Sequence, residues 1–195
     1  MSRSINYGIP DDMFERGGVP ITKEEIRAIV ISRLRLTDNA RVFDIGAGTG
    51  SVTVECALVA RNGIVFSFEK NTEALTLIRK NCEKFSTGNV VIIEGEAPGT
   101  LEKGGSFNRA FIGGSGGNIT GILDYIHNNM DAEGRVVVTA ITLDTLLRVR
   151  EFFKKVRYRH DIIQVSVSRV EEIAEYSMFK AINPVFIISA DKGDS

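Results

Sequence analysis

Cysteine and histidine are scarce in this chain of 195 residues, which contains two of each. Cys56 and Cys82 lie in helix-like stretches among apolar neighbours and form no Cys-x-x-Cys motif, which argues against a metal site and a disulfide framework. His127 and His160 have no second histidine or cysteine at ligand spacing. We therefore expect no bound metal and two buried thiols that form no disulfide.

The chain also lacks an excess of either charge and a long apolar run. It has 24 basic and 25 acidic residues, so its net charge of −1 gives no general attraction to nucleic acid or to an anionic membrane. The basic run KKVRYRHD at 154–161 is interpreted as a solvated helix end, with a phosphate or RNA patch as the alternative. No stretch is apolar and long enough to cross a bilayer or to form the core of a signal peptide. We expect a cytoplasmic protein with no membrane or nucleic-acid partner.

The arrangement of apolar residues predicts a single α/β domain over residues 1–195. The length and the apolar content of 43% suit one compact core. Short β-branched runs alternate with helical patterns, which is typical of parallel strands joined by crossover helices. Seven strands are expected, the last two joined by a polar, irregular link: 40–46, 63–69, 89–95, 109–114, 134–141, 161–170 and 183–190. This pattern predicts a doubly wound, mostly parallel seven-stranded sheet with an antiparallel strand near the C-terminus.

The N-terminal segment predicts an arm followed by a helix. Residues 1–20 include the Gly- and Pro-rich sequence GIPDDMFERGGVP, which is expected to form an arm or flap over a cleft. Asp11 and Asp12 in this arm either contact a substrate or shape a turn. A helix is expected over 21–36, with Thr22 as its N-cap and Glu25 as the capping-box partner three residues later.

A glycine-rich loop provides the sharpest local signal. In VFDIGAGTGSVTVE, a strand ends at Gly46, glycines follow at 48 and 50, and a helix begins at once. This G-x-G-x-G spacing is that of methyltransferases, because Ser51 occupies the position of the third dinucleotide glycine. Glu69 ends the next strand, where an acidic residue accepts hydrogen bonds from ribose hydroxyls. Asp44 either holds the loop or reaches the amino acid end of a cofactor. A tight turn and a helix cap are the structural alternatives, but the combination favours a nucleotide cofactor.

The second half of the chain favours S-adenosylmethionine over NAD. Glu96 and Ala97 follow the third strand, where adenine lies in the methyltransferase fold. The last two strands have no long helix between them, which suits the closing hairpin of that fold. Too little chain remains for the separate catalytic domain that NAD enzymes usually need.

Five blocks spread over nearly the whole chain resemble one enzyme family. The sequences GIPDDMFERGGVPITKEEIRA, DIGAGTGSVTVE, EGEAP, IGGSGG and NPVFII are similar to those of the decarboxylating precorrin-6B C(15)-methyltransferases of cobalamin biosynthesis. The resemblance implies a class I methyltransferase fold and methyl transfer from S-adenosylmethionine to carbon 15 of (cobalt-)precorrin-6B, coupled with loss of carbon dioxide from a ring acetate. It also implies a homo-oligomer, possibly a tetramer. The link over 169–182 departs from the family pattern.

The resemblance also implies site residues. The implied cofactor contacts are Thr22, Gly46, Ala47, Gly48, Thr49, Gly50, Glu69 and Ala97. No catalytic residue is assigned. The open alternatives are an RNA or protein methyltransferase of the same fold and a non-catalytic nucleotide-binding module.

A second glycine cluster follows the fourth strand. Methyltransferases that act on amino nitrogens commonly have Asp or Asn, Pro-Pro and an aromatic residue here, but this chain has glycines at 113, 114, 116 and 117. We expect Gly114, Ser115, Gly116 and Gly117 to contact the tetrapyrrole, because the missing bulk admits a flat macrocycle and amides at the next helix N-terminus receive its carboxylates. The alternative is a turn that packs strand against helix. Arg169 is expected at the same rim, where it either meets a carboxylate or pairs with Glu171 or Glu172.

Overall fold

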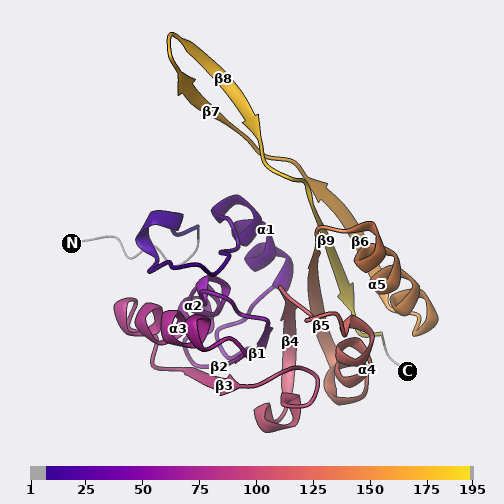
Figure 1. Cartoon of the computed structure of the whole chain (residues 1–195). Helices are drawn as coiled ribbons and strands as arrows, with labels where there is room; N and C mark the ends of the chain where they lie inside the picture. The colour runs from indigo at the N-terminus through magenta and orange to yellow at the C-terminus, as the bar shows by residue number, and fades with distance from the viewer. Residues whose placement is uncertain (1–7, 194–195) are drawn as a thin grey trace.

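The computed structural model of the chain describes residues 8–193, so residues 1–7 of the expected arm lie outside the described part. Over 8–193, seven strands form one sheet in the order β3-β2-β1-β4-β5-β9-β6 (Figure 1). Neighbouring strands are parallel, except that β9 runs antiparallel to β5 and β6. The sheet strands are β1 (Arg41–Ile45), β2 (Ile64–Glu69), β3 (Val90–Glu94), β4 (Phe107–Ile112), β5 (Met130–Ala140), β6 (Arg159–Val165) and β9 (Val185–Asp191). The expected doubly wound α/β fold is confirmed.

Helices cover both faces of the sheet. Side chains alternate along a strand, so Val42 of β1 joins a core cluster with helices α1 and α2, whereas the next residue, Phe43, joins a cluster with α4 and α5. Helix α3 packs beside α2. The helices are η1 (Asp11–Met13), α1 (Glu24–Leu34), α2 (Ser51–Val59), α3 (Thr72–Lys84), η2 (Leu101–Gly104), α4 (Ile119–Asn129) and α5 (Leu143–Lys155). Within residues 8–193, none of these helices has the length and apolar character needed to span a membrane.

The predicted start of α1 is wrong. Lys23, not Thr22, is the N-cap, and no side chain caps this helix end. A capping box needs the side chains of Thr22 and Glu25 to bond to the helix backbone. Instead, the Glu25 carboxylate pairs with Arg169, and the Thr22 carbonyl accepts a hydrogen bond from Arg27. The Glu25 side chain is therefore bonded to a residue 144 positions away and does not form a capping box.

The prediction for the two cysteines is confirmed in part. Neither forms a disulfide, and Cys56, on α2, is fully buried in the core. Cys82, on α3, is only partly buried.

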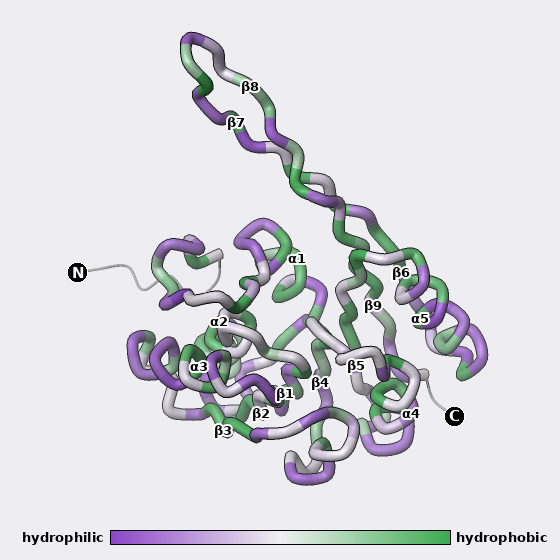
Figure 2. The backbone as a smooth tube through the Cα atoms, in the orientation of Figure 1, coloured by the Kyte–Doolittle hydropathy of each residue, from purple (hydrophilic) through white to green (hydrophobic). Residues whose placement is uncertain are grey.

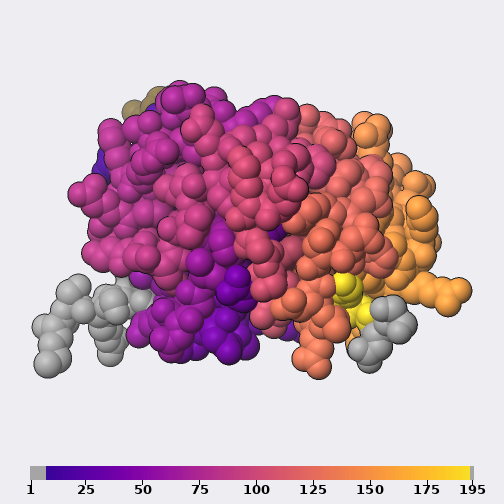
Figure 3. Space-filling model, turned by 90° about the horizontal axis from the view of Figure 1, so that it is seen from below, coloured from indigo at the N-terminus to yellow at the C-terminus, as the bar shows by residue number. Residues whose placement is uncertain are grey.

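The polar link over 169–182 is a β-hairpin, so the expectation of an irregular link is wrong. Strands β7 (Ser168–Ile173) and β8 (Tyr176–Ala181) pair antiparallel, and the expected strand over 161–170 is divided between β6 and β7. The hairpin projects from the ends of β6 and β9, and from below it is largely hidden behind the body (Figures 1 and 3). All of its strand residues are exposed, with hydrophobic and hydrophilic residues interspersed along it (Figure 2). With no buried face, the sequence lacks the alternation that marks a half-buried strand.

Candidate functional site

A large cavity lies at the carboxyl ends of the parallel strands. The strand order reverses between β1 and β4, which is where open α/β sheets bind ligands. The cavity has a volume of about 520 Å³, within the usual range for a small-molecule site. Its lining includes the glycine loop, the ends of β2, β4 and β5, the arm over Gly18–Lys23, and the root of the hairpin, which contributes Val165, Val167, Ile182, Asn183 and Val185.

The glycine loop supplies part of the cavity wall. Gly46, Ala47 and Gly48 line it, as do Thr22 and Glu69. Gly46 has a φ of +72°, and a Cβ atom added there would lie 2.4 Å from the carbonyl oxygen of Gly114. Only glycine fits this close approach of two loops.

The other two predicted loop residues lie behind the wall. Thr49 is buried and does not line a cavity. A Cβ atom on Gly50 would meet Ile78 of α3 at 3.0 Å, so this glycine serves the packing of α3 against the loop.

Glu69 is fixed at the junction of two cavities. Its Oε2 accepts a hydrogen bond from the Gly48 amide at 2.9 Å, and its Oε1 accepts from the amides of Lys70 (2.8 Å) and Asn71 (2.9 Å). The smaller cavity, of about 180 Å³, shares Glu69 with the larger one and is lined by Glu96, Ala97, Ser115 and Gly116. Ala97, the residue expected beside adenine, therefore lies across Glu69 from Thr22. The Lys70–Glu96 ion pair, at 2.5 Å, lies at this smaller cavity.

Asp44 supports the loop from behind. It is fully buried, its Oδ2 accepts a hydrogen bond from the Thr53 hydroxyl, and its Oδ1 has no hydrogen-bond partner in the described part of the chain. Burial raises the pKa of the Asp44 carboxyl to about 7, with a further contribution from the charge of Glu69. The contact with Thr53 joins β1 to α2. Of the two roles expected for Asp44, this geometry favours holding the loop.

A buried ion pair holds the arm, and sequence reasoning missed it. The Arg27 guanidinium is fully buried and donates from Nε to Glu55 Oε1 at 2.6 Å and from Nη1 to Asp11 Oδ1 at 3.0 Å. Glu55 also accepts from the amides of Gly8 and Ile9, both at 3.0 Å. Asp11 thus shapes the arm. The sequence signal that could have revealed this pair is a charged residue among the buried residues of each helix, Arg27 on α1 and Glu55 on α2.

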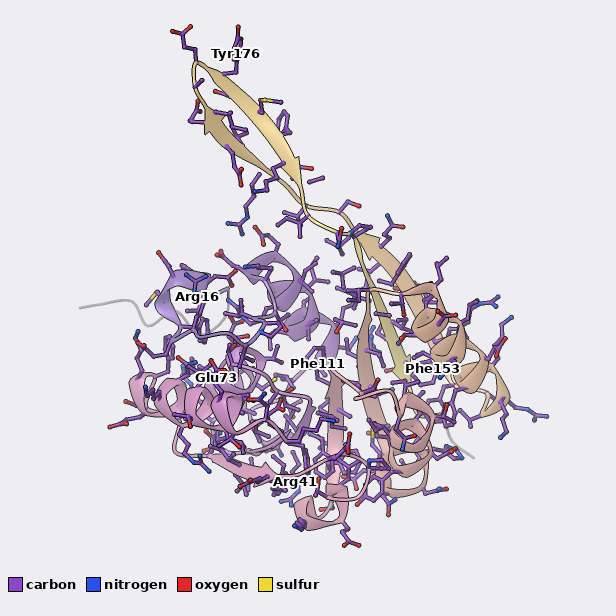
Figure 4. The ribbon with its side chains drawn as sticks, viewed as in Figure 1. Arg16, Arg41, Glu73, Phe111, Phe153 and Tyr176 are labelled. Atoms are coloured by element: carbon purple, nitrogen blue, oxygen red, sulfur yellow. The ribbon has the colours of Figure 1, made fainter. Side chains whose placement is uncertain are left out.

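Farther along the arm, Glu73 of α3 accepts a hydrogen bond from the Gly18 amide at 2.7 Å. Figure 4 shows Glu73 on the side of α3 that faces the arm, near Arg16. The arm is therefore anchored at Gly8, Ile9 and Asp11 and again at Gly18, where the segment that lines the cavity begins.

The second glycine cluster lies beside the first, as expected. Gly113 and Gly114 line the large cavity next to Gly46, and the position of an added Cβ on Gly114 is 3.8 Å or more from its neighbours. The amides of Gly113 and Gly114 both donate to the Ile45 carbonyl, at 3.0 and 3.3 Å, and are thus already used. The Gly121 amide in the first turn of α4 is capped by Asn118 at 3.1 Å. The Asn118 amide donates to the Ser115 carbonyl at 2.9 Å, so the amides of this segment that are left for a ligand carboxylate are those of residues 115–117, 119 and 120.

Arg169 pairs with neither of its expected partners on the hairpin. Its Nη2 donates to Glu25 Oε1 at 2.6 Å. Glu171 pairs with Lys180, and Glu172 accepts from the Ser177 hydroxyl. The hairpin root is thereby joined to the start of α1.

Comparison with known proteins places this chain among the enzymes of corrin synthesis. The family model described as "Precorrin methyltransferase domain" matches residues 12–192. The chain belongs to this family. A probable cobalt-precorrin-6B C(15)-methyltransferase (decarboxylating) from Saccharolobus solfataricus is 40% identical over 190 residues, which cover 95% of this chain and 96% of the relative.

Two solved structures support the same assignment. A precorrin-6y C5,15-methyltransferase from Geobacter metallireducens has a TM-score of 0.92 and 40% identity, and covers 98% of this chain and 100% of its own. A precorrin 8W decarboxylase from Methanobacterium thermoautotrophicum has a TM-score of 0.87 and 32% identity, with coverage of 93% and 98%. The resemblance found in the sequence, the methyltransferase class and the class I fold are confirmed.

Proposed function

We propose that the chain transfers a methyl group from S-adenosylmethionine to carbon 15 of cobalt-precorrin-6B and releases the carboxyl carbon of a ring acetate as carbon dioxide. The observation that carries the proposal is the pair of cavities that meet at Glu69, in a chain that matches a named enzyme of this activity over 95% of its length. The reaction is proposed to take place in the cytoplasm as part of cobalamin biosynthesis.

The described residues fit S-adenosylmethionine. Three backbone amides hold the Glu69 carboxylate between the two cavities, where it can accept hydrogen bonds from ribose hydroxyls. Gly46, Ala47 and Gly48 leave the large cavity open beside it, and Ala97 lines the smaller cavity expected for adenine. When bound, S-adenosylmethionine supplies an electrophilic methyl group.

The substrate is proposed to lie in the remaining part of the large cavity. Apolar side chains of Ile141, Val165, Val167, Ile182 and Val185 line that part, and Gly113 and Gly114 add no bulk. Such a wall suits the face of a flat macrocycle. The residues of this wall would act mainly by orienting the substrate toward the methyl donor, because alignment of two reactants can lower the activation barrier by roughly 7–11 kcal/mol.

We also propose that the chain forms a homo-oligomer, possibly a tetramer, through the hairpin. An isolated two-stranded hairpin is marginally stable in water. The hairpin of this chain nevertheless exposes Val170, Ile173, Tyr176, Met178 and Phe179, with exposed fractions of 53–78%. Tyr176 lies at its tip, far from the body (Figure 4). Sedimentation velocity over a range of protein concentrations tests this proposal, and a monomer at all of them would refute it.

Titration calorimetry combined with product mass tests the catalytic proposal. We expect the wild-type protein to bind S-adenosylmethionine and Glu69→Ala to bind it at least 10-fold more weakly, since the charged hydrogen-bond acceptor for the ribose is lost. With cobalt-precorrin-6B, the product should gain one methyl group and lose one carbon dioxide. Methyl transfer to tRNA or protein would support the alternative methyltransferase, and cofactor binding without transfer would support a nucleotide-binding module.

A further inference from the structure

The ion pair between Arg169 and Glu25 links two elements that are far apart in the sequence. Arg169 is the second residue of β7, at the hairpin root, and Glu25 is the second residue of α1. The guanidinium Nη2 lies 2.6 Å from Glu25 Oε1, and the two side chains are 50% and 38% exposed. A pair with this exposure contributes little to stability. The pair is therefore of interest for its place in the fold and not for its contribution to stability.

The pair leaves hydrogen-bonding capacity unused on both sides. Glu25 Oε2 is buried and has no hydrogen-bond donor within residues 8–193. In the same part of the chain, Arg169 makes one hydrogen bond from its five N–H groups. A permanent Arg–carboxylate contact is commonly bidentate, with both oxygens used. The single hydrogen bond between Arg169 and Glu25 is therefore what we expect of an ion pair that can be exchanged for another.

The pair lies beside the large cavity, although Arg169 itself is not among the lining residues. Glu25 lines it, as do Val167, two residues before Arg169, and Ile182 opposite in the hairpin root. Lys23 also lines the cavity, but its ammonium lies 3.6 Å from Asp11 and is thus partly neutralised. Lys23 and Arg169 thus both have N–H donors left for a ligand, and of the two Arg169 has the planar guanidinium that can bind a carboxylate through two parallel hydrogen bonds.

We propose that Arg169 is a specificity-determining residue that receives a carboxylate of the substrate in exchange for Glu25. The proposal rests on the proposed function, in which the substrate is a macrocycle bearing several acetate and propionate groups. A planar guanidinium binds a carboxylate through two parallel hydrogen bonds, which an amide or ester cannot replace. Glu25 keeps the guanidinium paired before the substrate binds. Substrate binding then exchanges one carboxylate for another, and little additional desolvation is required.

Binding of uroporphyrin III, a flat octacarboxylate, tests the exchange through fluorescence quenching. We expect Arg169→Gln to weaken binding roughly 10-fold and Arg169→Lys to weaken it less, because lysine keeps the charge but not the planar fork. Glu25→Gln should strengthen binding about 2- to 5-fold, since a competing anion is removed. The matched control is Lys180→Gln. Lys180 lies directly opposite Arg169 in the hairpin and carries the same charge, but it pairs with Glu171. It should change binding less than 2-fold.

Steady-state kinetics provides the second measurement. Arg169→Gln should raise KM for cobalt-precorrin-6B with kcat within 2-fold and with unchanged affinity for S-adenosylmethionine, which also shows that the variant is folded. The inference is overturned if wild type does not bind uroporphyrin III, if Arg169→Gln and Lys180→Gln lose binding equally, or if Glu25→Gln weakens it. Arg169-dependent porphyrin binding without turnover of cobalt-precorrin-6B would refute the proposed function and leave this carboxylate site standing.

Discussion

The two walls of the large cavity are held in different ways. On the glycine-loop side, Glu69 accepts three backbone hydrogen bonds, and the buried Arg27–Glu55 pair anchors the arm. On the hairpin side, Val165 and Val185 pack against the core cluster that contains α1, whereas Val167 and Ile182 are not part of that cluster, and the hairpin root is joined to α1 by the half-exposed Arg169–Glu25 pair. We therefore predict a rigid wall on the glycine-loop side, suited to a cofactor that is the same in every turnover, and an adjustable wall at the hairpin root, for a large substrate that must enter and leave.

The largest expected effect comes from breaking the rigid wall at Arg27. Arg27→Met leaves the Glu55 carboxylate buried without its cation, so the free energy of unfolding should fall by about 3–5 kcal/mol. Urea denaturation measures this loss. The control is Arg33→Gln on the same helix, which removes a partly exposed pair with Asp161 and should cost less than about 1 kcal/mol. Equal losses in the two variants would show that the buried pair does not anchor the arm.

A methyl group on Gly46 should damage the rigid wall without changing any charge. Gly46→Ala places Cβ against Gly114 and requires an unfavourable backbone conformation, so affinity for S-adenosylmethionine should fall about 100-fold, or roughly 2.7 kcal/mol. Gly114→Ala has room for its Cβ and should lose less than 3-fold. Calorimetry on both variants compares them, with circular dichroism to confirm folding. Normal affinity in Gly46→Ala would contradict the role of the close approach.

Gly114→Leu tests the second residue of this contact, which we expect to face the substrate. A bulky side chain there points into the space assigned to the macrocycle, so turnover should fall about 10-fold or more while calorimetry shows S-adenosylmethionine affinity within about 3-fold of wild type. Unchanged turnover and KM in a folded variant would refute the role of the glycine surface in substrate binding.

Asp44 should make the rigid wall sensitive to pH. Its carboxyl has a pKa of about 7 in the folded protein and a lower one when unfolded, so the folded state binds more protons between about pH 4 and 7. Stability should therefore fall as pH rises through this window. Between pH 5 and 8 the Asp44 contribution amounts to about 2–3 kcal/mol. Urea denaturation should show a smaller pH-dependent loss in Asp44→Asn than in wild type, and parallel profiles would exclude the titration.

The smallest effect on folding is expected at the hairpin. Phe179→Ser replaces a side chain that is 78% exposed, so the unfolding free energy of the dissociated chain should change by less than about 0.5 kcal/mol. Sedimentation should nevertheless show weaker self-association. A large loss of stability at a concentration where wild type is monomeric would mean that the hairpin belongs to the folding core.

The features of this fold that depend on local sequence could be predicted, and those that depend on long-range contacts could not. The glycine loop, the place of Glu69 at the end of a strand and the alternation of strands with helices follow from local patterns, because strand, turn and helix signals are contiguous there. The hairpin was missed because its strands have no buried face, and its turn has Ala174 at a φ of +56° where Gly or Asn is usual. Long-range pairs were also invisible. Glu25 was assigned to a capping box, but its partner lies 144 positions away.

The most direct test of the proposed reaction follows the transferred carbon. The protein is incubated with cobalt-precorrin-6B and S-adenosylmethionine carrying a ¹³C methyl group, and the product is examined by NMR while released carbon dioxide is measured. We expect one labelled methyl group on carbon 15 and an equal molar amount of carbon dioxide. Label on another ring carbon, or transfer without release of carbon dioxide, would contradict the proposed function.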